Sequence, residues 1–450
     1  MSTDISVSFQ LAECIRRRAA EPLQHAERLI IKRALLDTLG VGIAGWRLRS
    51  ARIAYDALEL AQSPGAGRIL GLTRPCASTT AALMNGLLAH AQLFDDNNDP
   101  MIAHPSAPLV ATLLAVGPRV AADAELLLTA YCCGFETSVG LGAMLNPLHY
   151  ERGWHATATL GVFGATAAAS VLLGSTHAQI ANALGIAASS AAGLRENFGT
   201  MVMGLHAGHA AHDGVTAALL ARNDFTSSSH VFEGTYGFFA AFGAVVNSTA
   251  LDNFGSELLN SGIQCKLFPS GAPTLCAVEA ALALVPKLKG RIEAVRCWVD
   301  PWYQKTLKEE DPTDTFSAKV NLRYCVAAAL VKGRLTLDEF ETDALADQAI
   351  RCMMRRISVI IDPQLESIGT FPARLEVDCE GSTLSESRLA PRGTAASPLS
   401  DADLIEKFTD CLNRYATRDR AQSIASKILD LESLLPPQLY DVLSGEPNNV

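Results

Sequence analysis

Apolar residues recur at helical spacing through roughly the first 265 residues of the chain. Ile31, Leu35 and Leu39 stand four residues apart, as on one face of a helix. Small-residue runs such as "GATAAAS" and "GIAASSAAG" indicate closely approaching helices, although the helix propensity of alanine alone predicts the same elements. Polar or glycine-containing breaks separate six further segments that we predict to be helical, 78–92, 106–120, 124–143, 157–173, 177–194 and 206–222.

The pattern changes after about residue 270. Val295, Cys297 and Val299 alternate with polar or amphipathic neighbours, which predicts a half-buried strand. "ISVIID" (357–362) is a second strand, 373–379 and 383–389 flank "EGS" as a hairpin, and 317–331 and 336–356 are predicted helices. The chain then leaves this region through "APRGTAASPLS" (390–400) and returns to helical periodicity.

These elements predict a mainly α protein with two domains. A large all-helical domain takes residues 1–268 and 398–450, and a smaller α+β lid domain takes residues 269–397. A length of 450 residues and an apolar content of nearly half suffice for two such cores.

The net charge indicates which binding partners to expect, and the cysteines indicate the cellular compartment. The formal net charge of −10 argues against a nucleic-acid-binding surface, which needs clustered cations. The 11 cysteines show no CxxC pair and no zinc-ligand spacing, so we expect reduced thiols in a cytoplasmic protein. The first 22 residues lack the apolar core and small-residue cleavage site of a signal peptide, so we expect none there. The short apolar stretch Leu160 to Gly174 is predicted to be a buried helix rather than a membrane span.

Four polar stretches interrupt the apolar helices. They are "FDDNNDPMIAHPS" (94–106), "ERGWHATATLG" (151–161), "FGTMVMGLHAGHAAHDG" (198–214) and "QCKLFPSGAPT" (264–274). The first holds three aspartates and a histidine, and oxygen ligands of this kind suit Mg²⁺ or Ca²⁺. It lacks the glycine of a calcium-binding loop, however, and we predict no metal. A cleft between domains is a common place for a small-molecule site, and we expect one here.

Together the four stretches resemble the MmgE/PrpD family, which includes 2-methylcitrate dehydratase, cis-aconitate decarboxylase and iminodisuccinate epimerase. "NGLLAHAQLFDD…HPS" is similar to the family's NG-x-x-x-H-x-x-DFDD…HPS, and "GWHATATLGVFGATAAA" to its G-[FW]-H-x-T-x-x-x-G segment. "GTMVMGLHAGHAAHDG" is similar to GTMTKPLHAG-x-AA-x-[NG]G, and "SPLSDADLIEKF" to the family's C-terminal stretch. The resemblance covers nearly the whole chain.

The resemblance implies a helical domain joined to an α+β lid, a homodimer, and a site at the junction of the domains. It also implies chemistry at a carbon next to a carboxylate of a small polycarboxylic acid, without a metal or an organic cofactor. Such chemistry needs a base for a weakly acidic C–H proton and cations for the developing negative charge.

Site residues are carried over where this sequence matches the family. His104 and His155 match family histidines and would be catalytic, although His104 would equally suit the start of a helix. Lys266 would bind a substrate carboxylate unless it is an ordinary surface lysine, and Tyr324 would donate a proton or orient substrate unless it is a core tyrosine. Asp95 matches DFDD.

The remaining loop residues have less defined roles. Asp96 also matches DFDD, and either aspartate would lie at the cleft or cap a helix. We expect Asn97, which follows them, to bind substrate, whereas Asp99 has no counterpart that we can assign.

Four positions depart from the family pattern. The first aspartate of DFDD is Leu93, the lysine of TKPLHAG is Met203, a later polar position is Gly271, and a later histidine is Leu275. These changes remove polar and cationic groups and make one wall apolar. A substrate with fewer carboxylates, or with an alkyl group in place of one, therefore fits better than a citrate-like triacid.

Three functions follow from these residues. The first is a lyase, namely a dehydratase that abstracts a proton α to a carboxylate of a small polycarboxylic acid with or without an alkyl substituent. The second is decarboxylation, epimerisation or double-bond isomerisation of a related acid, and His104 with His155 would supply the two bases of an epimerase. The third is a family member that only binds.

Overall fold

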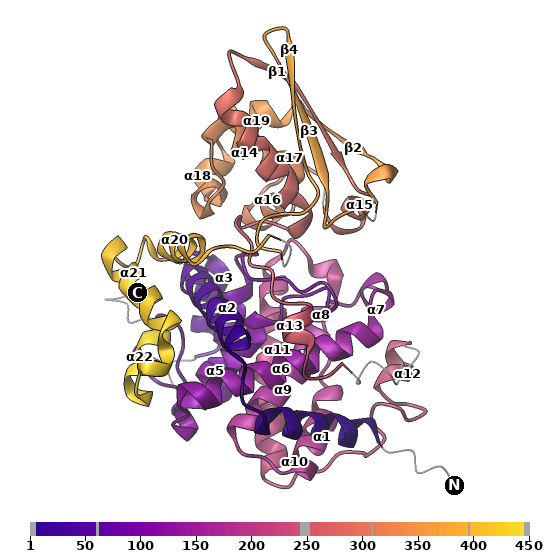
Figure 1. Ribbon diagram of the computed structural model, residues 1–450, viewed down its shortest axis with the longest axis vertical. Helices are drawn as coiled ribbons and strands as arrows, with labels where there is room; N and C mark the ends of the chain where they lie inside the picture. The colour runs from indigo at the N-terminus through magenta and orange to yellow at the C-terminus, as the bar shows by residue number, and fades with distance from the viewer. Residues whose placement is uncertain are drawn as a thin grey trace. The chain divides into compact units, whose positions relative to one another are not determined.

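A computed structural model describes residues 6–59, 63–243, 253–307, 309–366, 368–394 and 397–444 of the protein. The chain forms two compact units (Figure 1). The first contains Met1–Gln264 and Ser400–Val450, and the second contains Cys265–Leu399. The domain boundaries drawn from the sequence at 268 and 398 stay predictions, because compact units need not fold independently.

Helices build the first unit around α11 (Met201–Arg222), which packs against α4 (Ser78–His90) and α9 (Gly161–Leu172). α6 (Ala124–Leu145) packs on the other side of α9. The remaining α-helices of this unit are α1 (Val7–Ala20), α2 (His25–Ala44), α3 (Arg49–Ala57), α5 (Ser106–Val116), α7 (Leu148–Glu151), α8 (Ala156–Thr159), α10 (His177–Ala188), α12 (Phe238–Phe242), α13 (Glu257–Asn260), α20 (Asp401–Leu412), α21 (Arg418–Leu429) and α22 (Pro436–Ser444).

Glycines let the central helices approach closely. A Cβ on Gly86 of α4 would lie 2.5 Å from the carbonyl oxygen of Ala207 in α11, and one on Gly164 of α9 would lie 2.8 Å from that of Gly134 in α6. Both distances are shorter than a van der Waals contact, so a larger residue would push the backbones apart. Gly164 begins the "GATAAAS" run, and the expected close approach of helices there is confirmed.

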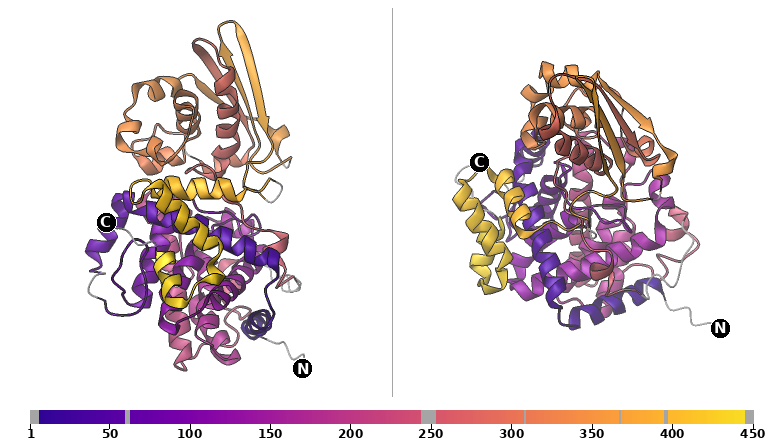
Figure 2. Two further views of the ribbon diagram at one scale, coloured as in Figure 1. Left: turned by 60° about the vertical axis from the view of Figure 1, so that its left-hand side comes forward. Right: turned by 45° about the horizontal axis from the view of Figure 1, so that its top comes forward.

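The C-terminal helices, yellow in Figure 2, belong to the first unit. α20 packs along α2, where a Cβ on Gly40 would lie 2.8 Å from the ring of Phe408. The two backbones are therefore in close contact beside the buried residues Asp37 and Lys407.

Among the described helices, α6 alone is long and apolar enough to cross a membrane. Its apolar window is 89% buried inside the protein, which is the environment of a core helix. The stretch from Leu160 to Gly174 forms the shorter helix α9, whose side chains are almost all buried, as the sequence predicts.

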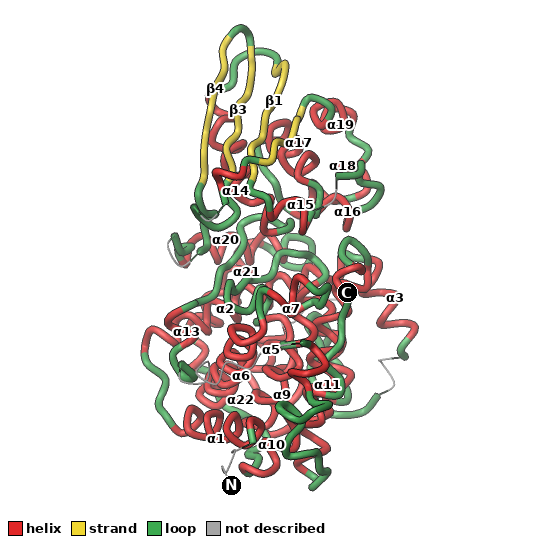
Figure 3. The backbone as a smooth tube through the Cα atoms, turned by 90° about the vertical axis from the view of Figure 1, so that its right-hand side faces the viewer, coloured by secondary structure: helices red, strands yellow, loops and turns green. Residues whose placement is uncertain are grey.

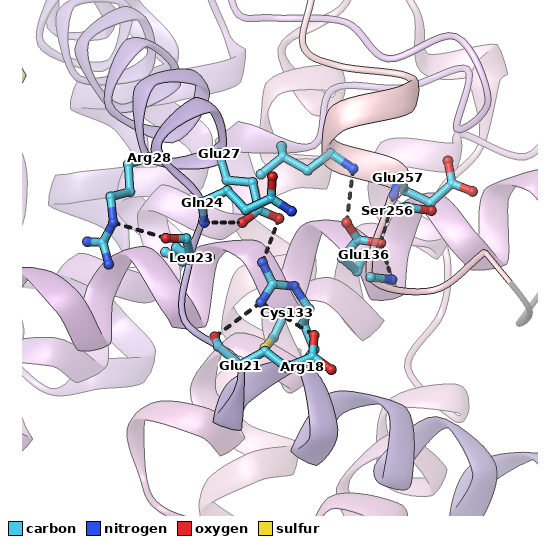
Figure 4. A network of polar contacts seen from close by, with 12 residues as sticks. Arg18, Glu21, Leu23, Gln24, Glu27, Arg28, Cys133, Glu136, Ser256 and Glu257 are labelled. Carbon is cyan, nitrogen blue, oxygen red and sulfur yellow. Dashed lines mark hydrogen bonds and ion pairs between the residues drawn. The ribbon is translucent and has the colours of Figure 1, made fainter.

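Polar contacts tie α1, α2, α6 and α13 together (Figure 4). The buried guanidinium of Arg18 donates to Glu27 at 2.6 Å. The buried carboxylate of Glu136 in α6 accepts from the backbone N–H groups of Gly255, Glu257 and Leu258 at 2.8–3.1 Å. These bonds satisfy donors at the start of α13 and fix the segment that runs on to Gln264.

The second unit contains a four-stranded sheet, drawn in yellow in Figure 3, in the order β2-β1-β3-β4. β1 (Ile292–Val299) pairs in parallel with β2 (Ile357–Ile361) and antiparallel with β3 (Ala373–Cys379). β3 and β4 (Ser382–Arg388) form the predicted hairpin, whose turn residues Glu380 and Gly381 both have positive φ, as a tight two-residue turn requires.

Helices cover the sheet, with α14 (Leu275–Leu284) on β3 and β4 and α17 (Leu322–Lys332) on β2. The other α-helices of this unit are α15 (Trp302–Thr306), α16 (Thr315–Lys319), α18 (Thr342–Leu345) and α19 (Gln348–Met354). The predicted fold class, mainly α with a smaller α+β part, is confirmed.

Several predicted helices are interrupted. The segment 317–331 divides into α16 and α17 because the Asn321 side chain accepts from the Tyr324 N–H and starts a new helix. Thr336 and Asp347 start new helical segments in 336–356 in the same way. The segment 157–173 divides into α8 and α9 at Leu160, and α10 ends at Ala188, six residues before the predicted end.

Candidate active site

Four histidines from four parts of the first unit lie together. His90 is the last residue of α4, His104 precedes α5, His155 is the N-cap of α8 and His206 lies in α11. The ring centroid of His90 lies 4.8 Å from that of His104 and 5.4 Å from that of His155, which lies 5.1 Å from that of His206. His90 thus joins the two histidines predicted from the sequence, and we call the four the histidine cluster.

A tight turn brings Asp95 back to the end of α4. Leu93 adopts a left-handed backbone conformation with φ of 53°, and its N–H donates to the carbonyl oxygen of His90 at 3.1 Å. The Asp95 carboxylate then accepts from Nδ1 of His90 at 2.7 Å and lies 3.8 Å from Nδ1 of His104. Asp95 therefore adds a carboxyl group to the histidine cluster.

The tautomer of His104 follows from its partner. Its Nδ1 lies 2.6 Å from the carbonyl oxygen of Asp96, and a carbonyl can only accept, so Nδ1 carries the proton. The backbone N–H of His104 donates to Thr157 Oγ1 at 3.2 Å. Nε2 of the neutral ring is thus the atom with a lone pair for proton transfer.

His155 and His206 form a buried imidazole pair, with their Nδ1 atoms 2.9 Å apart. One Nδ1 must donate and the other accept, so the pair holds a single proton between these atoms. Burial, and then the neighbouring histidines, lower the pKa of His155 well below its ordinary value. Burial likewise lowers the pKa of His206 to about 4. Both rings are neutral near pH 7, the state in which an imidazole accepts a proton.

Asp96 takes the helix-capping role that the sequence left open. Its carboxylate accepts from the backbone N–H of Ser106, the first residue of α5, at 3.3 Å and from the Ser106 hydroxyl, which also bonds Tyr131. Burial raises the pKa of Asp96 to about 7, although the Ser106 bonds lower it. Asp96 therefore holds the loop 94–106 onto α5.

The asparagines of this loop fix its far side. Asn97 pairs through its backbone with Gln264 in both directions, at 2.8 and 2.9 Å. The buried Asn98 side chain donates to Ser261 Oγ and the Gly262 carbonyl oxygen and accepts from the Met101 N–H. Substrate binding by Asn97 stays a prediction, whereas Asn98 has a structural role that the sequence did not reveal.

Lys266 and Tyr324 belong to the second unit. Lys266 is only 1% exposed, so it is not a surface lysine. The buried Tyr324 hydroxyl donates to the Glu339 carbonyl oxygen at 2.5 Å, and its ring packs against Phe340. These surroundings favour the core-tyrosine alternative. The catalytic role of Tyr324, and a cleft that Lys266 shares with His104 and His155, stay predictions.

At the four positions that depart from the family pattern, the residue is either buried or contributes through its backbone. Leu93 is the left-handed residue of the turn, and Met203 is buried in α11 one turn before His206. Gly271 donates its N–H to the Lys319 carbonyl oxygen, and Leu275 is buried at the start of α14. A buried apolar side chain thus stands one helical turn before His206, where the family pattern has a lysine.

Sequence reasoning missed His90 and His206. Each stands in a quoted motif, "NGLLAHAQ" and "LHAG", inside a predicted helix. Both histidines could have been found, because each is a polar residue in an apolar helix within a stretch that already matched the family's motifs. Only the turn at Leu93 and the proximity of α4, α8 and α11 show that the two rings meet the others.

His90, Asp95 and His104 are the one group of described residues whose ligand atoms, all within 4.8 Å of one another, would suit a metal ion. The bond of His104 Nδ1 to a carbonyl keeps that nitrogen protonated, and a protonated nitrogen cannot bind a metal. The existing bond therefore leaves Nε2 of His104, and not Nδ1, as the nitrogen that could bind a metal.

We predict that EDTA treatment leaves any activity of the protein within about twofold of that of untreated protein, because imidazole and carboxylate groups can transfer protons without a metal. Activity of dialysed protein and elemental analysis are the measurements. Stoichiometric metal together with chelator-sensitive turnover would show that the ion is required.

The structure has a helical unit with a buried histidine–carboxylate cluster and a second, α+β unit. These features agree with what the resemblance to the MmgE/PrpD family implies. The chain belongs to the MmgE/PrpD family. The model of the family's N-terminal domain matches residues 9–247, and the model of its C-terminal domain matches residues 268–432. The predicted family membership is confirmed.

The chain is similar over most of its length to proteins named for decarboxylation. The cis-aconitate decarboxylase-like protein oryM of Aspergillus oryzae is 27% identical over 95% of this chain and 94% of its own. The cis-aconitate decarboxylase of Homo sapiens is 27% identical over 90% and 87%, and that of Aspergillus terreus 23% identical over 90% and 88%.

Proposed function

We propose that the protein is a cofactor-independent lyase that acts on a small carboxylic acid by proton transfer at a carbon next to a carboxylate. Dehydration of a polycarboxylic acid, with or without an alkyl substituent, is the reaction predicted from the sequence. Decarboxylation is the second candidate, because the relatives are named cis-aconitate decarboxylases. The observation that carries the proposal is the buried cluster in which neutral imidazoles lie close to one carboxylate.

The cluster has the groups that either reaction needs. In a dehydration, Nε2 of His155 accepts the α-proton, the C–O bond of the adjacent carbon breaks, and the hydroxyl group takes a proton from a second group of the cluster and leaves as water. The imidazolium formed at His155 donates its Nδ1–H to His206. In a decarboxylation, the C–C bond breaks, carbon dioxide leaves, and an imidazolium returns a proton to the carbon. The Asp95 carboxylate lies 2.7 Å from Nδ1 of His90 and 3.8 Å from Nδ1 of His104, so it can orient both rings.

The substrate follows from the missing lysine. Met203 is apolar and buried one helical turn from His206, so a charged carboxylate at that point would find no ion partner in the Met203 side chain. We therefore propose a substrate with one carboxylate fewer than a citrate-like triacid, or with an alkyl group in its place.

We further propose a cytoplasmic homodimer that binds neither nucleic acid nor membrane. The support is the net charge of −10, the reduced cysteines and the family resemblance. Sedimentation of the purified protein tests the dimer.

The reaction is tested by incubating the enzyme in D₂O with citrate, an alkylcitrate, cis-aconitate and itaconate and following each acid by NMR. A dehydratase forms a double bond, a decarboxylase releases carbon dioxide, and an isomerase changes neither mass nor composition. Exchange of an α-proton with deuterium reports the shared first step even on a poor substrate. Tight binding of one acid without exchange or turnover of any would favour a protein that only binds.

Lys266→Ala is expected to raise KM by roughly tenfold or more, with a smaller change in kcat, if the ammonium binds a substrate carboxylate equally in ground and transition states. Lys289→Ala, at an exposed lysine of the same unit, is the control. Steady-state kinetics on the acid found above give both constants. Unchanged KM and kcat would remove Lys266 from the site.

A further inference from the structure

Lys407, a buried lysine of α20, binds the backbone carbonyl oxygen of the residue just before Asp95. Nζ of Lys407 lies 2.5 Å from Oδ1 of Asp37 in α2 and donates to the carbonyl oxygen of Phe94 at 2.7 Å. It also lies 3.9 Å from the centroid of the Phe94 ring. The Lys407 and Asp37 side chains are 3% and 0% exposed.

The Lys407 contact matters because of the place in the chain where it occurs. Phe94 lies between Leu93, which turns the chain in a left-handed conformation, and Asp95, which bonds His90. A carbonyl held on one side fixes the plane of the following peptide and hence the direction in which Asp95 leaves the backbone. Lys407 and the Leu93 turn together aim the Asp95 carboxylate at the histidine cluster.

Stability alone does not explain a buried ion pair here. Removing two charges from water costs several kcal/mol, and apolar residues of similar volume often stabilise a protein as well or better. An apolar pair would not bond the Phe94 carbonyl, however, and that buried acceptor would lose its donor. The lysine is therefore suited to holding one backbone conformation of the loop.

The packing of α20 supports the same conclusion. Gly40 lets α2 approach Phe408 so closely that an added Cβ would lie 2.8 Å from the ring. Gly40 is one helical turn after Asp37, and Phe408 follows Lys407 directly. α20 thus lies close against α2 at the place where Lys407 contacts both Asp37 and the Phe94 carbonyl oxygen.

We propose that Lys407, held by Asp37, is a positioning residue of the active site, which acts by fixing the Phe94 carbonyl and thereby the Asp95 carboxylate beside His90 and His104. The role extends the site to the C-terminal helices, which hold none of the residues predicted from the sequence. Its effect on turnover rests on the proposed function, whereas its effect on the loop does not.

The experiment compares Lys407→Met, the double variant Asp37→Asn/Lys407→Met and the control Lys427→Met, an exposed lysine of α21. The double variant removes both buried charges and so avoids an unpaired Asp37. Three quantities are measured: the melting temperature by circular dichroism, kcat and KM, and amide hydrogen exchange of residues 95–103 by mass spectrometry.

We expect the double variant to melt near the wild-type temperature, with kcat lower by roughly ten- to a hundredfold and KM changed less, as for a small misplacement of a reacting group. Its loop amides should exchange faster by about tenfold or more. The Lys427→Met control should match wild type in all three.

Wild-type kcat and loop protection in the double variant would overturn the proposal. Failure of the double variant to fold would also overturn it, because the pair would then serve stability. Absence of turnover in the wild-type protein would refute the proposed function instead, and the exchange comparison would still decide whether Lys407 fixes the loop.

Discussion

The His155→Ala enzyme is expected to turn over roughly a hundredfold or more slowly than wild type, the scale of a lost general acid or base. His155 is held at three points, since its N–H donates to the Gly193 carbonyl oxygen, its own carbonyl accepts the first bonds of α8, and its ring bonds His206. The backbone bonds survive replacement by alanine, so the fold should remain. Only the group proposed to accept the proton is removed.

The pH dependence of the wild-type enzyme checks the same assignment. Because burial lowers the pKa of His155 below its ordinary 6.5, the acidic limb of kcat/KM should have its midpoint below pH 6.5. Below this pH the unfolded chain binds a proton that the buried rings do not, so stability also falls as the pH drops from 6.5 towards the pKa of His206 near 4. Rates are therefore compared only at pH values where the circular dichroism spectrum shows that the protein is still folded.

A matched variant separates a catalytic loss from a general one. His212 lies on α11 outside the cluster, and its ring bonds the neighbouring Asp213 at 2.8 Å. His212→Ala should keep wild-type kcat. Equal losses in the two variants, or full activity of His155→Ala, would mean that the proton is transferred elsewhere.

The fold was largely predictable because both of its periodicities are strong. Alternation at Val295, Cys297 and Val299 marks the strand β1, whose inner face is buried. "EGS" supplies the two positive-φ residues of the turn between β3 and β4. Helix interruptions were not predicted, because a cap such as Asn321 differs little from an interior polar residue until its side chain is seen to bond the backbone.

The candidate site was predictable only in part, for a physical reason. His104 and His155 stand in polar segments between apolar helices, where a histidine is readily predicted to be a site residue. His90 and His206 stand in apolar helices, where a histidine resembles a satisfied core residue, and Lys407 lies about 300 residues from the loop that it holds. Periodicity describes a single element, whereas these contacts depend on how α2, α4, α8, α11 and α20 pack.

Leu93 shows how a departure from the family pattern gains meaning from the structure. A left-handed conformation costs a leucine more than an aspartate or asparagine, by roughly 1 kcal/mol. The chain keeps this turn although its residue is poorly suited to it. In this turn the chain returns Asp95 to His90, where its carboxylate bonds the ring.

His104 is expected to give the second large effect, and two substitutions resolve which of its nitrogens matters. An asparagine amide has a donor near the place of Nδ1 and so can keep the bond to the Asp96 carbonyl, but it has nothing at Nε2. If Nε2 transfers the proton, His104→Asn and His104→Ala should both lose roughly a hundredfold in kcat. If the ring only anchors the loop, His104→Asn should stay within about threefold of wild type, and the catalytic role of His104 would be rejected.

Deuterium exchange in the same variants distinguishes the reaction types. In a lyase where His155 takes the α-proton and His104 serves the other bond, His104→Ala should lose turnover but still exchange the α-proton, whereas His155→Ala should lose both. In an epimerase with one base on each face of the carbon, each single variant should exchange one substrate epimer only. The double variant should lose little more than the worse single one, since residues that act as a unit are not additive. Full activity of the double variant would place the chemistry outside the histidine pair altogether.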